Sequence, residues 1–409
     1  RKKQTTLNRN KFYKDNAEFI ILVGSETGST FNFANVFYNA LITAGKKVFL
    51  SELNEYASYK KAKNIIIFTA TYGEGEAPIN ANKFIEKISK IHQNNILRFS
   101  VVGFGSLEYP QYCKFALLVQ ANLELQEKFI PISPIFKVNN QSFSDFNKWL
   151  KEWNSFYKTD FTFSEDSLLN SQKKKEDFTV IHKTEINIDN TFLIQLKPNK
   201  KTKFKSGDLL SITPKNDYRN RLYSIAKIDN TILLSIKKHE FGLCSNYFNG
   251  LNNKDKVIAN IQENKNFHFP KKTKEVILIA NGTGIAPFLG MINGKKSKIR
   301  IHLFWGGRTK ESFYLYQKNI NSALKNKKLT SFFAAYSKEK SETYYVQDLL
   351  KNETKLITDT LKNGNIIMIC GSNAMLKGAI EVLEEISKNH LESSLQKYKD
   401  NNQIKIDCY

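Results

Sequence analysis

Apolar runs of strand length alternate with amphipathic stretches over the first third of the chain. The run Phe19 to Val23 ends in a loop of Gly, Ser and Thr and is followed by an amphipathic stretch, Phe31 to Ala44. Two further apolar runs, Asn64 to Phe68 and Phe99 to Val102, are each followed by a loop that contains Gly and ends at a Pro. This alternation predicts an α/β domain with a parallel, doubly wound sheet, whose loops meet at the carboxyl ends of the strands.

The pattern changes after this domain. The polar stretch from Tyr157 to Asp177 predicts a linker, and the short apolar runs beyond it predict a small antiparallel β-barrel. These runs are Thr191 to Lys197, Asp208 to Thr213, Leu222 to Ala226 and Thr231 to Lys237. From Lys274 onward strands and helices alternate again, which predicts a second α/β domain that binds a nucleotide. Its apolar runs are Val276 to Ala280, Ile301 to Trp305, Thr330 to Ala335 and Ile366 to Cys370.

The composition narrows the class of protein. At 409 residues, with 41% hydrophobic and 25% charged residues, the chain resembles a soluble globular protein of two or three domains. No apolar run approaches the roughly 18 residues that a membrane helix needs, and no signal-peptide pattern is present. The four cysteines, Cys113, Cys244, Cys370 and Cys408, lie far apart, without histidines at metal-ligand spacing. We therefore expect no metal site, no disulfide framework and a reducing, cytoplasmic compartment.

The formal charge of +23 raises the question of a nucleic-acid partner. The excess is mostly Lys and is spread along the chain, without an arginine-rich stripe, interleaved aromatic residues or a zinc finger. This pattern favours a Lys-rich solvated surface and no nucleic-acid partner. Contact with an anionic membrane or an acidic protein stays an alternative. Because the sequence starts with Arg1-Lys2-Lys3, a membrane-anchored portion upstream of Arg1 also stays open.

The first loop has the chemistry of a phosphate site. Ser25-Glu26-Thr27-Gly28-Ser29-Thr30 offers four hydroxyl groups at the start of a predicted helix, and Gly28 lets backbone amides approach an anion. No Lys follows in the position that a nucleoside-triphosphate loop requires. Taken alone, such a loop is more often an ordinary helix cap. Two later loops support the phosphate interpretation.

Together with Phe33-Ala34-Asn35, this loop resembles the FMN-phosphate loop in the flavodoxin-like domain of diflavin reductases. Residues 70–75 resemble the second FMN loop of that family, and residues 103–113 resemble the third. The resemblance implies that Tyr72 and Tyr109 stack on the two faces of the isoalloxazine ring. The implied FMN contacts are Ser25, Glu26, Thr27, Gly28, Ser29, Thr30, Ala70, Thr71, Tyr72, Gly73, Gly105, Tyr109 and Tyr112.

This domain departs from the family at two places. Ser106 stands where the family usually has Asn or Asp, and the acidic cluster before the last helix is replaced by Val138-Asn139-Asn140-Gln141. Because those acids commonly meet a basic acceptor in the family, the second departure leaves the identity of the acceptor open. FMN binding is less affected.

A second flavin signature lies in the predicted barrel. Arg221-Leu222-Tyr223-Ser224 resembles the Arg-x-Tyr-Ser signature of the ferredoxin-NADP reductase superfamily, and Gly242-Leu243-Cys244-Ser245 resembles its companion loop. The chemistry agrees, because Arg binds a pyrophosphate through charge-assisted hydrogen bonds and Tyr can lie on a flavin ring. The resemblance assigns these eight residues to FAD and places Ser224 near the reactive N5 atom.

The string Asn281 to Phe288 follows a predicted strand, opens a helix and resembles the nicotinamide-nucleotide loop of the same superfamily. Segments 337–338 and 345–347 resemble the part that holds the adenosine 2′-phosphate of NADPH. The family usually has Arg at Lys338 and Lys at Thr343, so we expect the guanidinium of Arg308 to compensate. The implied NADPH contacts are Gly282, Thr283, Gly284, Arg308, Ser337, Lys338, Tyr345 and Gln347.

Two segments near the end of the chain complete the implied catalytic set. Cys370-Gly371-Ser372 resembles the Cys-Gly motif whose cysteine lies near the nicotinamide. Asp407-Cys408-Tyr409 resembles the family's terminal acid and the aromatic residue that covers the flavin. The residues expected to assist hydride transfer are Ser224, Cys370, Asp407 and Tyr409.

The resemblance extends from about Glu18 to Tyr409. It implies a flavodoxin-like α/β domain joined to a ferredoxin-NADP reductase-like module, which consists of an antiparallel β-barrel FAD domain and an α/β NADP-binding domain. The expected segments are 1–17 (basic N-terminal segment), 18–157 (FMN domain), 158–176 (linker), 177–270 (FAD barrel) and 271–409 (NADP domain).

The family's long helical connecting domain has no counterpart in this sequence. Gly207-Asp208-Leu209-Leu210 reaches Arg221 across one short loop, at the place where cytochrome P450 reductases and sulfite reductase flavoproteins carry the insertion. Contact between the two flavins would then depend on linker motion or on a second copy of the chain.

These features predict an NADPH-dependent diflavin reductase that passes electrons from NADPH to FAD, then to FMN and to a haem or metal-protein acceptor. The flavoprotein component of a sulfite reductase is a close alternative. A basic protein that binds polyanions or membrane surfaces on flavin folds is the alternative from another class. The expected location is the cytoplasm, or the cytoplasmic face of the membrane if an upstream anchor exists.

Overall fold

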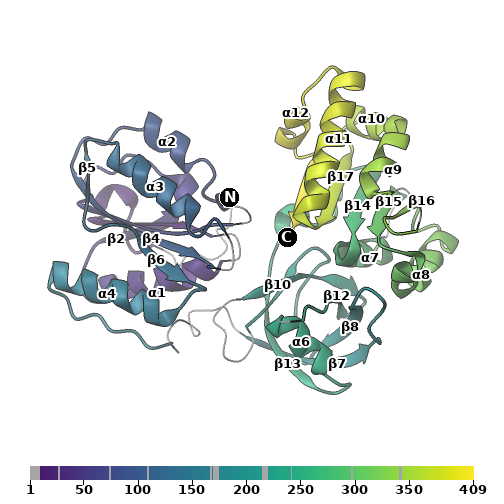
Figure 1. Ribbon diagram of the computed structural model, residues 1–409, viewed down its shortest axis with the longest axis horizontal. Coiled ribbons are helices and arrows are strands. Elements are labelled where there is room, and N and C mark those ends of the chain that lie inside the picture. Colours follow the sequence, from purple (N-terminus) through teal and green to yellow (C-terminus); the bar gives the residue numbers. More distant parts are fainter. Residues whose placement is uncertain are drawn as a thin grey trace. The chain divides into compact units, whose positions relative to one another are not determined.

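The chain folds into two compact units, shown in Figure 1. The first comprises Arg1–Lys174 and Thr213–Asn220, and the second comprises Lys175–Ile212 and Arg221–Tyr409. The computed structural model describes residues 10–25, 28–72, 75–107, 110–165, 168, 175–213, 220–240, 242–295, 298–339 and 343–409. The predicted site residues Glu26, Thr27, Gly73 and Tyr109 lie outside the described residues.

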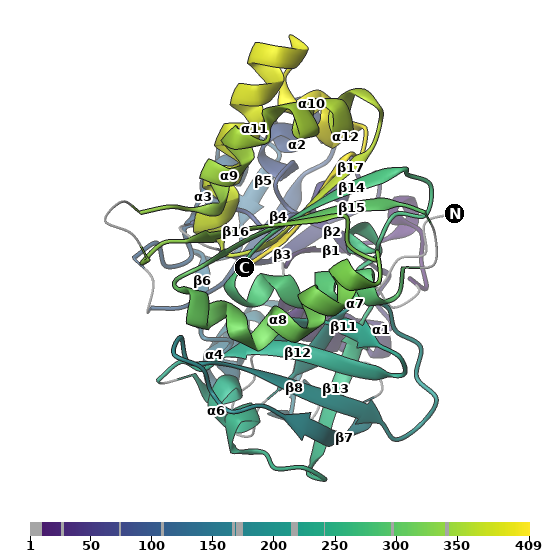
Figure 2. The same cartoon turned by 90° about the vertical axis from the view of Figure 1, so that its right-hand side faces the viewer.

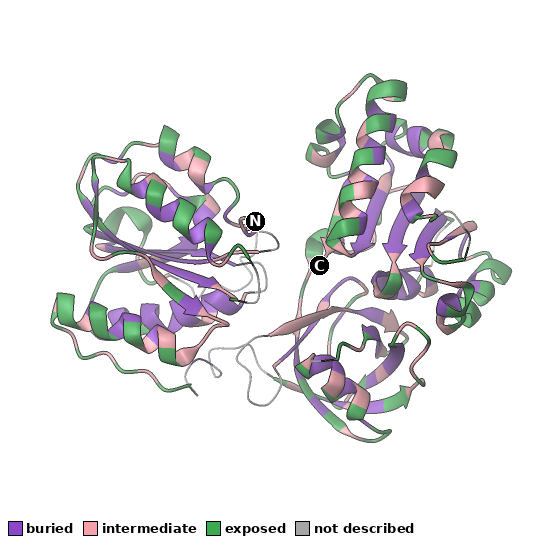
Figure 3. Ribbon diagram, viewed as in Figure 1, coloured by how far each residue is buried: buried purple, intermediate pink, exposed green. Residues whose placement is uncertain are grey.

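A parallel sheet forms the centre of the first unit, in the order β2-β1-β3-β4-β5, with β6 also paired to β4. Its strands are β1 (Phe19–Gly24), β2 (Val48–Glu52), β3 (Asn64–Ala70), β4 (Leu97–Gly105), β5 (Phe129–Pro131) and β6 (Phe136–Asn139). Strands β1 and β3 are nearly continuous apolar runs because both faces of the sheet are covered, as the burial colours of Figure 3 show.

Helices pack on both faces of this sheet. They are α1 (Ser29–Thr43), α2 (Phe84–Lys90), α3 (Lys114–Glu124) and α4 (Phe143–Tyr157), with short 3-10 turns η1 (Lys14–Asn16) and η2 (Leu53–Glu55). Side chains of α1 and α4 form one buried cluster, and those of α2 and α3 form another. Phe161, Phe163 and Leu168, from the polar stretch after α4, pack against the α1/α4 cluster.

The second unit begins with an antiparallel sheet in the order β10-β9-β13-β7-β8-β12-β11. Its strands are β7 (Glu176–Lys183), β8 (Thr191–Pro198), β9 (Leu209–Ile212), β10 (Arg221–Ser224), β11 (Ala226–Ile228), β12 (Thr231–Lys237) and β13 (Lys256–Gln262). Helix α6 (Leu243–Gly250) and the 3-10 turn η3 (Lys265–Phe267) flank it. Strands β9 and β10 pair directly, with Ile212 opposite Arg221.

A parallel sheet in the order β16-β15-β14-β17-β18 completes the second unit. Its strands are β14 (Glu275–Asn281), β15 (Arg300–Gly307), β16 (Ser331–Tyr336), β17 (Ile366–Gly371) and β18 (Ile404–Cys408). The helices are α7 (Ala286–Asn293), α8 (Lys310–Lys325), α9 (Val346–Asn352), α10 (Thr354–Lys362), α11 (Asn373–Leu391) and α12 (Leu395–Asp400), with the 3-10 turn η4 (Gly282–Ile285) before α7.

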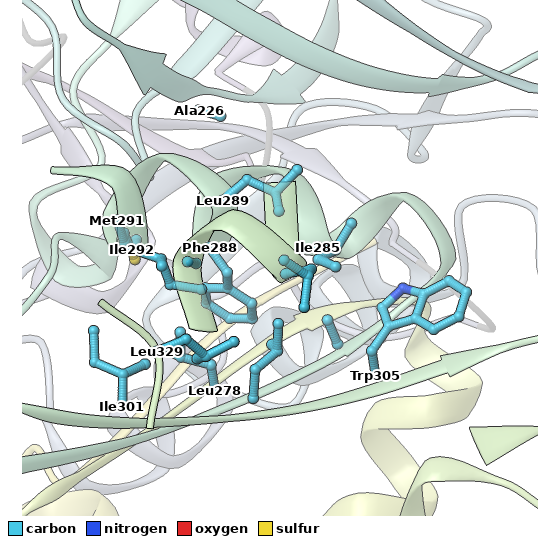
Figure 4. Close-up of a cluster of buried hydrophobic side chains, with 14 of the residues drawn as sticks. Ala226, Leu278, Ile285, Phe288, Leu289, Met291, Ile292, Ile301, Trp305 and Leu329 are labelled. Carbon is cyan, nitrogen blue, oxygen red and sulfur yellow. The ribbon is translucent and has the colours of Figure 1, made fainter. Parts of the chain in front are cut away.

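Helices α7 and α8 lie between the barrel and this parallel sheet (Figure 2). Phe288 and Leu289 of α7 belong to a buried cluster that also contains Ala226 from the barrel and Leu278 from the parallel sheet (Figure 4). At Gly290 a Cβ atom would lie 2.5 Å from the backbone nitrogen of Lys227, so only glycine allows α7 to pack this closely on β11. The barrel and the parallel sheet therefore share one hydrophobic core. The predicted fold class is confirmed: a flavodoxin-like parallel sheet, an antiparallel barrel and a second α/β domain.

Candidate functional site

The first candidate site lies where β1 runs into α1. Gly28 adopts the left-handed conformation (φ 84°) at the N-cap of α1, and no described side chain caps this helix. Its N–H donates to Ser25 Oγ at 3.0 Å, which closes the loop. The buried hydroxyl of Thr30 has no hydrogen-bond partner within the described residues. A helix N-terminus that no described side chain caps, together with a buried hydroxyl group, fits the phosphate of FMN.

The second and third loops leave the same edge of the sheet, since β1, β3 and β4 run parallel. Ala70 ends β3, and the next residue, Thr71, donates its N–H to Phe104 of β4 at 2.9 Å. The half-buried side chain of Tyr72 follows directly. At Gly105 a Cβ atom would lie 2.9 Å from Cys113 Sγ and 3.0 Å from the ring of Tyr112, so the third loop needs glycine here.

The two asparagines that replace the family's acidic cluster hold this third loop. Asn139 Oδ1 accepts a hydrogen bond from the N–H of Leu107 at 3.0 Å, and the N–H of Asn140 donates to the carbonyl of Gly105 at 2.8 Å. The segment therefore supports the loop that was expected to contact FMN, with neutral side chains in place of carboxylates.

The two segments predicted to bind FAD lie together beside the barrel. The Tyr223 ring of β10 packs edge-on against Phe248 of α6, with centroids 5.2 Å apart. Gly242 is the N-cap of α6, and Ser245 Oγ donates to its carbonyl at 3.0 Å. Of the remaining predicted residues, Arg221 and Leu222 are half-buried on β10, Leu243 is exposed and Cys244 is buried in the barrel core.

The predicted nicotinamide-nucleotide loop lies where β14 and β17 come together. At Gly284 a Cβ atom would lie 2.2 Å from the carbonyl oxygen of Cys370, so this glycine permits the close approach of η4 to the end of β17. Asn281 Oδ1 accepts from the N–H of Ser372 at 2.9 Å, and its Nδ2 donates to Ser372 Oγ at 3.0 Å. Trp305 Nε1 donates to the carbonyl of Gly282 at 3.1 Å. These contacts fix the loop that a dinucleotide would meet at the switch point of the sheet.

Three of the residues expected to hold the 2′-phosphate are neighbours. The N–H of Ser337 donates to Gly307 at 3.0 Å and the N–H of Lys338 donates to the carbonyl of Arg308 at 2.8 Å, beyond the ends of β15 and β16. Arg308 Nη1 also lies 3.8 Å from Asp189 Oδ1, in the hairpin between β7 and β8. Arg308, which was expected to compensate at the 2′-phosphate, therefore already lies near the carboxylate of Asp189.

The other two predicted contacts in this region begin α9. The N–H of Tyr345, which is exposed, donates to Asp348 Oδ2 at 2.8 Å and caps the helix. The side chain of Gln347 lies against Gly378 of α11, where a Cβ atom would be 3.0 Å from its Nε2.

The predicted catalytic residues converge at the ends of β10, β17 and β18. Ser224 Oγ donates to Asp407 Oδ2 at 2.7 Å, and Cys370 lies opposite Asp407 in the pairing of β17 with β18. The hydroxyl of Tyr409 lies 3.0 Å from Thr283 Oγ1. Burial raises the pKa of the Cys370 thiol well above its usual value, and the nearby Asp407 charge raises it further, so this thiol stays neutral at pH 7.

A chain of contacts that the sequence did not predict lies behind Asp407. Asn264 Nδ2 donates to Asp407 Oδ1 at 3.3 Å, and the N–H of Asn264 donates to Asp208 Oδ1 at 2.9 Å. His268 Nε2 is 2.5 Å from the same Asp208 oxygen. Burial raises the pKa of Asp208, but the hydrogen bonds from His268 and from backbone N–H groups outweigh it and set this pKa below its usual value. The sequence pattern placed Asp208 only in a predicted strand, and no motif or pattern pointed to Asn264.

No group of three or more His, Cys, Asp or Glu residues is placed to hold a metal ion in the part of the chain that the structure describes. None of the helices seen there combines the length and apolarity needed to cross a membrane.

Known families match both units. Residues 21–153 match the Flavodoxin family, and residues 278–381 match the Oxidoreductase NAD-binding domain family. A nitric oxide synthase of Bombyx mori is 31% identical over 39% of this chain and 14% of its own length. NADPH-dependent diflavin oxidoreductase 1 of Kluyveromyces lactis is 32% identical over 39% of this chain and 26% of its own length.

A third relative aligns over most of both chains. The sulfite reductase (NADPH) flavoprotein alpha-component of Buchnera aphidicola is 24% identical over 93% of this chain and 87% of its own length. That alignment runs over 526 positions, against 409 residues in this chain, so the relative contains segments without a counterpart here. The chain thus spans a small part of the first two relatives and most of the third.

Proposed function

The chain belongs to the diflavin reductase family, and from this premise we propose that it carries electrons from NADPH through FAD and FMN to a haem or metal-protein acceptor that takes them singly. As a family member it is an NADPH-dependent oxidoreductase with FMN, FAD and NADPH as cofactors. The observation that supports the proposed electron path most is the Ser224–Asp407 hydrogen bond beside Cys370. We place its action in the cytoplasm, or at the cytoplasmic face of the membrane if an upstream anchor exists.

The bound flavins supply the chemistry, since FAD accepts electron pairs as hydride and FMN releases electrons one at a time. The chain's own residues would orient and tune that transfer. Asp407 fixes the hydroxyl of Ser224 and supplies a negative charge, whereas the neutral, buried Cys370 keeps water from the end of β17. Tyr409, about half exposed and in contact with Thr283 through its hydroxyl, would cover the flavin ring.

The nucleotide and FMN contacts are proposed on the same basis. We assign the FMN phosphate to the start of α1, where Gly28 and Thr30 lie, and the FAD pyrophosphate to Arg221 and the start of α6. We assign the NADPH 2′-phosphate to the group that Arg308, Ser337 and Lys338 form. The remaining predicted contacts keep the roles that the family resemblance implies.

An anaerobic titration with NADPH tests the proposal. The purified chain is expected to contain one FAD and one FMN, to become reduced at both, and to support NADPH-driven reduction of cytochrome c. A matched Thr30→Val variant removes the buried hydroxyl at nearly constant volume and should release FMN while FAD reduction by NADPH persists. A chain that holds a single flavin, or no flavin, contradicts the proposal.

A second candidate is the flavoprotein arm of a sulfite reductase. It is favoured by the alignment with the Buchnera aphidicola protein, which covers 87% of that relative. Co-purification with a sirohaem protein, and sulfite reduction only when both are present, would select it. The alternative from another class, a basic polyanion- or membrane-surface-binding protein, predicts salt-sensitive binding of polyanions without NADPH-driven reduction of cytochrome c.

A further inference from the structure

A cavity of about 790 Å³ opens beside α7 in the second unit, and none of the residues assigned to a cofactor lines it. Five of its fourteen lining residues are lysines, and the single acidic one is Asp229. In the whole chain, by contrast, 62 of 409 residues are Lys or Arg and 39 are Asp or Glu. The lysines are Lys205, Lys227, Lys271, Lys295 and Lys328. This concentration exceeds what the basic composition alone would place in one cavity.

Backbone oxygens and an aromatic ring hold three of these ammonium groups at half-buried positions. Lys295 Nζ donates to the carbonyl of Lys328 at 3.1 Å, and Lys328 Nζ donates to the carbonyl of Asn293 at 2.6 Å. Lys227 Nζ lies 5.2 Å from the centre of the Phe204 ring. Within the described residues none of these three lysines forms an ion pair with a carboxylate. Carbonyl groups fix an ammonium but do not neutralise its charge.

The two remaining lysines approach the same space from other elements. Lys205 precedes β9 and Lys271 follows η3, and both are exposed. Burial lowers the pKa of Lys295, as expected for an ammonium group that lacks a nearby anion. The cavity thus combines three held, half-buried ammonium groups with the two exposed lysines Lys205 and Lys271, which we call the rim lysines. Together they favour a ligand with several negative charges.

We propose that this cavity binds a small polyanion with two or more phosphate groups. A single carboxylate would satisfy one of the five cations, whereas a chain of phosphates presents an oxygen to each. The cavity volume lies within the range of about 300 to 1,000 Å³ that is usual for small-molecule sites. Inorganic tripolyphosphate and the phosphate chain of ATP share this chemistry. His268, which contacts Asp208 behind Asp407, is among the lining residues, but no residue assigned to a cofactor is. Either proposal can therefore fail without the other.

Isothermal titration calorimetry of the flavin-loaded full chain with tripolyphosphate tests the proposal. Lys205→Gln/Lys271→Gln removes two rim charges from exposed side chains, and Lys355→Gln/Lys362→Gln removes two exposed charges from α10 as a matched control. The rim variant should weaken binding about tenfold, and the control should leave it within about twofold. Thermal unfolding of each variant verifies that the fold is kept.

Parallel titrations with ATP separate the two ligand sources. Tighter binding of ATP than of tripolyphosphate assigns the site to a nucleotide, and equal binding assigns it to inorganic polyphosphate. Repeating them with a fixed concentration of NADP⁺ removes binding at the nicotinamide-nucleotide site, and the rim-dependent binding should persist. The proposal is overturned if no saturable binding occurs, or if the rim and control variants weaken it equally.

Discussion

The carboxylate of Asp407 accepts hydrogen bonds from two side chains that reach it from different parts of the barrel. Ser224 holds one oxygen at 2.7 Å and Asn264 holds the other at 3.3 Å. Because both oxygens are held, the carboxylate has one orientation, and the hydroxyl of Ser224 is oriented with it. Asn264 therefore acts as a positioning residue, through Asp407.

Replacing Asn264 by Ala should lower the kcat of NADPH-dependent ferricyanide reduction about tenfold, with little change in the KM for NADPH. The reason is that the variant removes the side-chain hydrogen bond to Asp407 Oδ1 while Ser224 still holds Oδ2, and it touches no group assigned to the nucleotide. Ser224→Ala removes the group nearer the reaction and should lower kcat more, by about a hundredfold. Exposed Asn266, two residues along, provides the control, and its Ala variant should behave as wild type. An increase in KM alone for Asn264→Ala would contradict this role.

Among the elements, η4 and the end of β17 pack with their backbones in close contact. Gly284→Ala would place a Cβ atom 2.2 Å from the carbonyl oxygen of Cys370. We expect the free energy of unfolding to fall by about 1 to 3 kcal/mol, and NADPH oxidation to fall with it, because backbone must move against backbone.

Gly282→Ala, in the same turn, is the matched control. Its Cβ atom would meet nothing within 4 Å, and only its φ of +49° opposes a side chain, at about 1 kcal/mol. Urea unfolding monitored by circular dichroism compares the two variants. Equal losses would show that the close approach at Gly284 is not the cause.

The residues on either side of η3, Asn264 and His268, both contact Asp208. We therefore expect the free energy of unfolding to depend on pH through Asp208. Its folded-state pKa lies below the usual 3.8, so the unfolded chain takes up the proton first as the pH falls. The stabilisation by this carboxylate is therefore complete above pH 3.8, the unfolded-state value. It is lost as the pH falls from there through the folded-state pKa. The difference in unfolding free energy between wild type and Asp208→Asn should reach its full size above pH 3.8 and shrink as the pH falls below it. Exposed Asp359, replaced by Asn, should show no such change.

At the scale of the whole molecule, each unit has its own core. Phe288 is fully buried in the cluster shared by the barrel and the second parallel sheet, and Phe37 is fully buried in a cluster of the first unit. Calorimetry should show two unfolding transitions. Phe288→Ala should lower the Tm of one, and Phe37→Ala the Tm of the other, since each removes about 3 to 5 kcal/mol from one core. A single transition that either variant shifts as a whole would contradict separate cores.

The sequence predicts features whose residues are close together along the chain, and it does not predict contacts between residues that are far apart. The alternation of apolar runs was enough for both parallel sheets, and the Arg-x-Tyr-Ser strand and the Gly-Thr-Gly turn were found because their residues are contiguous. The contact of Asn264 with Asp407 joins residues 143 positions apart, and no local pattern announces it. The lysine-lined cavity is assembled from several separate segments and was equally hidden. Periodicity reports which face of an element is buried, but not which loops meet.

The hairpin between β7 and β8 carries a carboxylate, Asp189, that competes with a bound nucleotide for Arg308. Asp189 accepts a hydrogen bond from Ser312 Oγ and lies 3.8 Å from Arg308, while Asn187 Nδ2 donates to the carbonyl of Ser312 at 3.4 Å. If Arg308 binds the 2′-phosphate, it exchanges one anionic partner for another. The preference for NADPH over NADH would then depend on the difference in free energy between the Arg308–phosphate pair and the Arg308–Asp189 pair, and not on the first pair alone. The barrel would take part in that choice without touching the nucleotide.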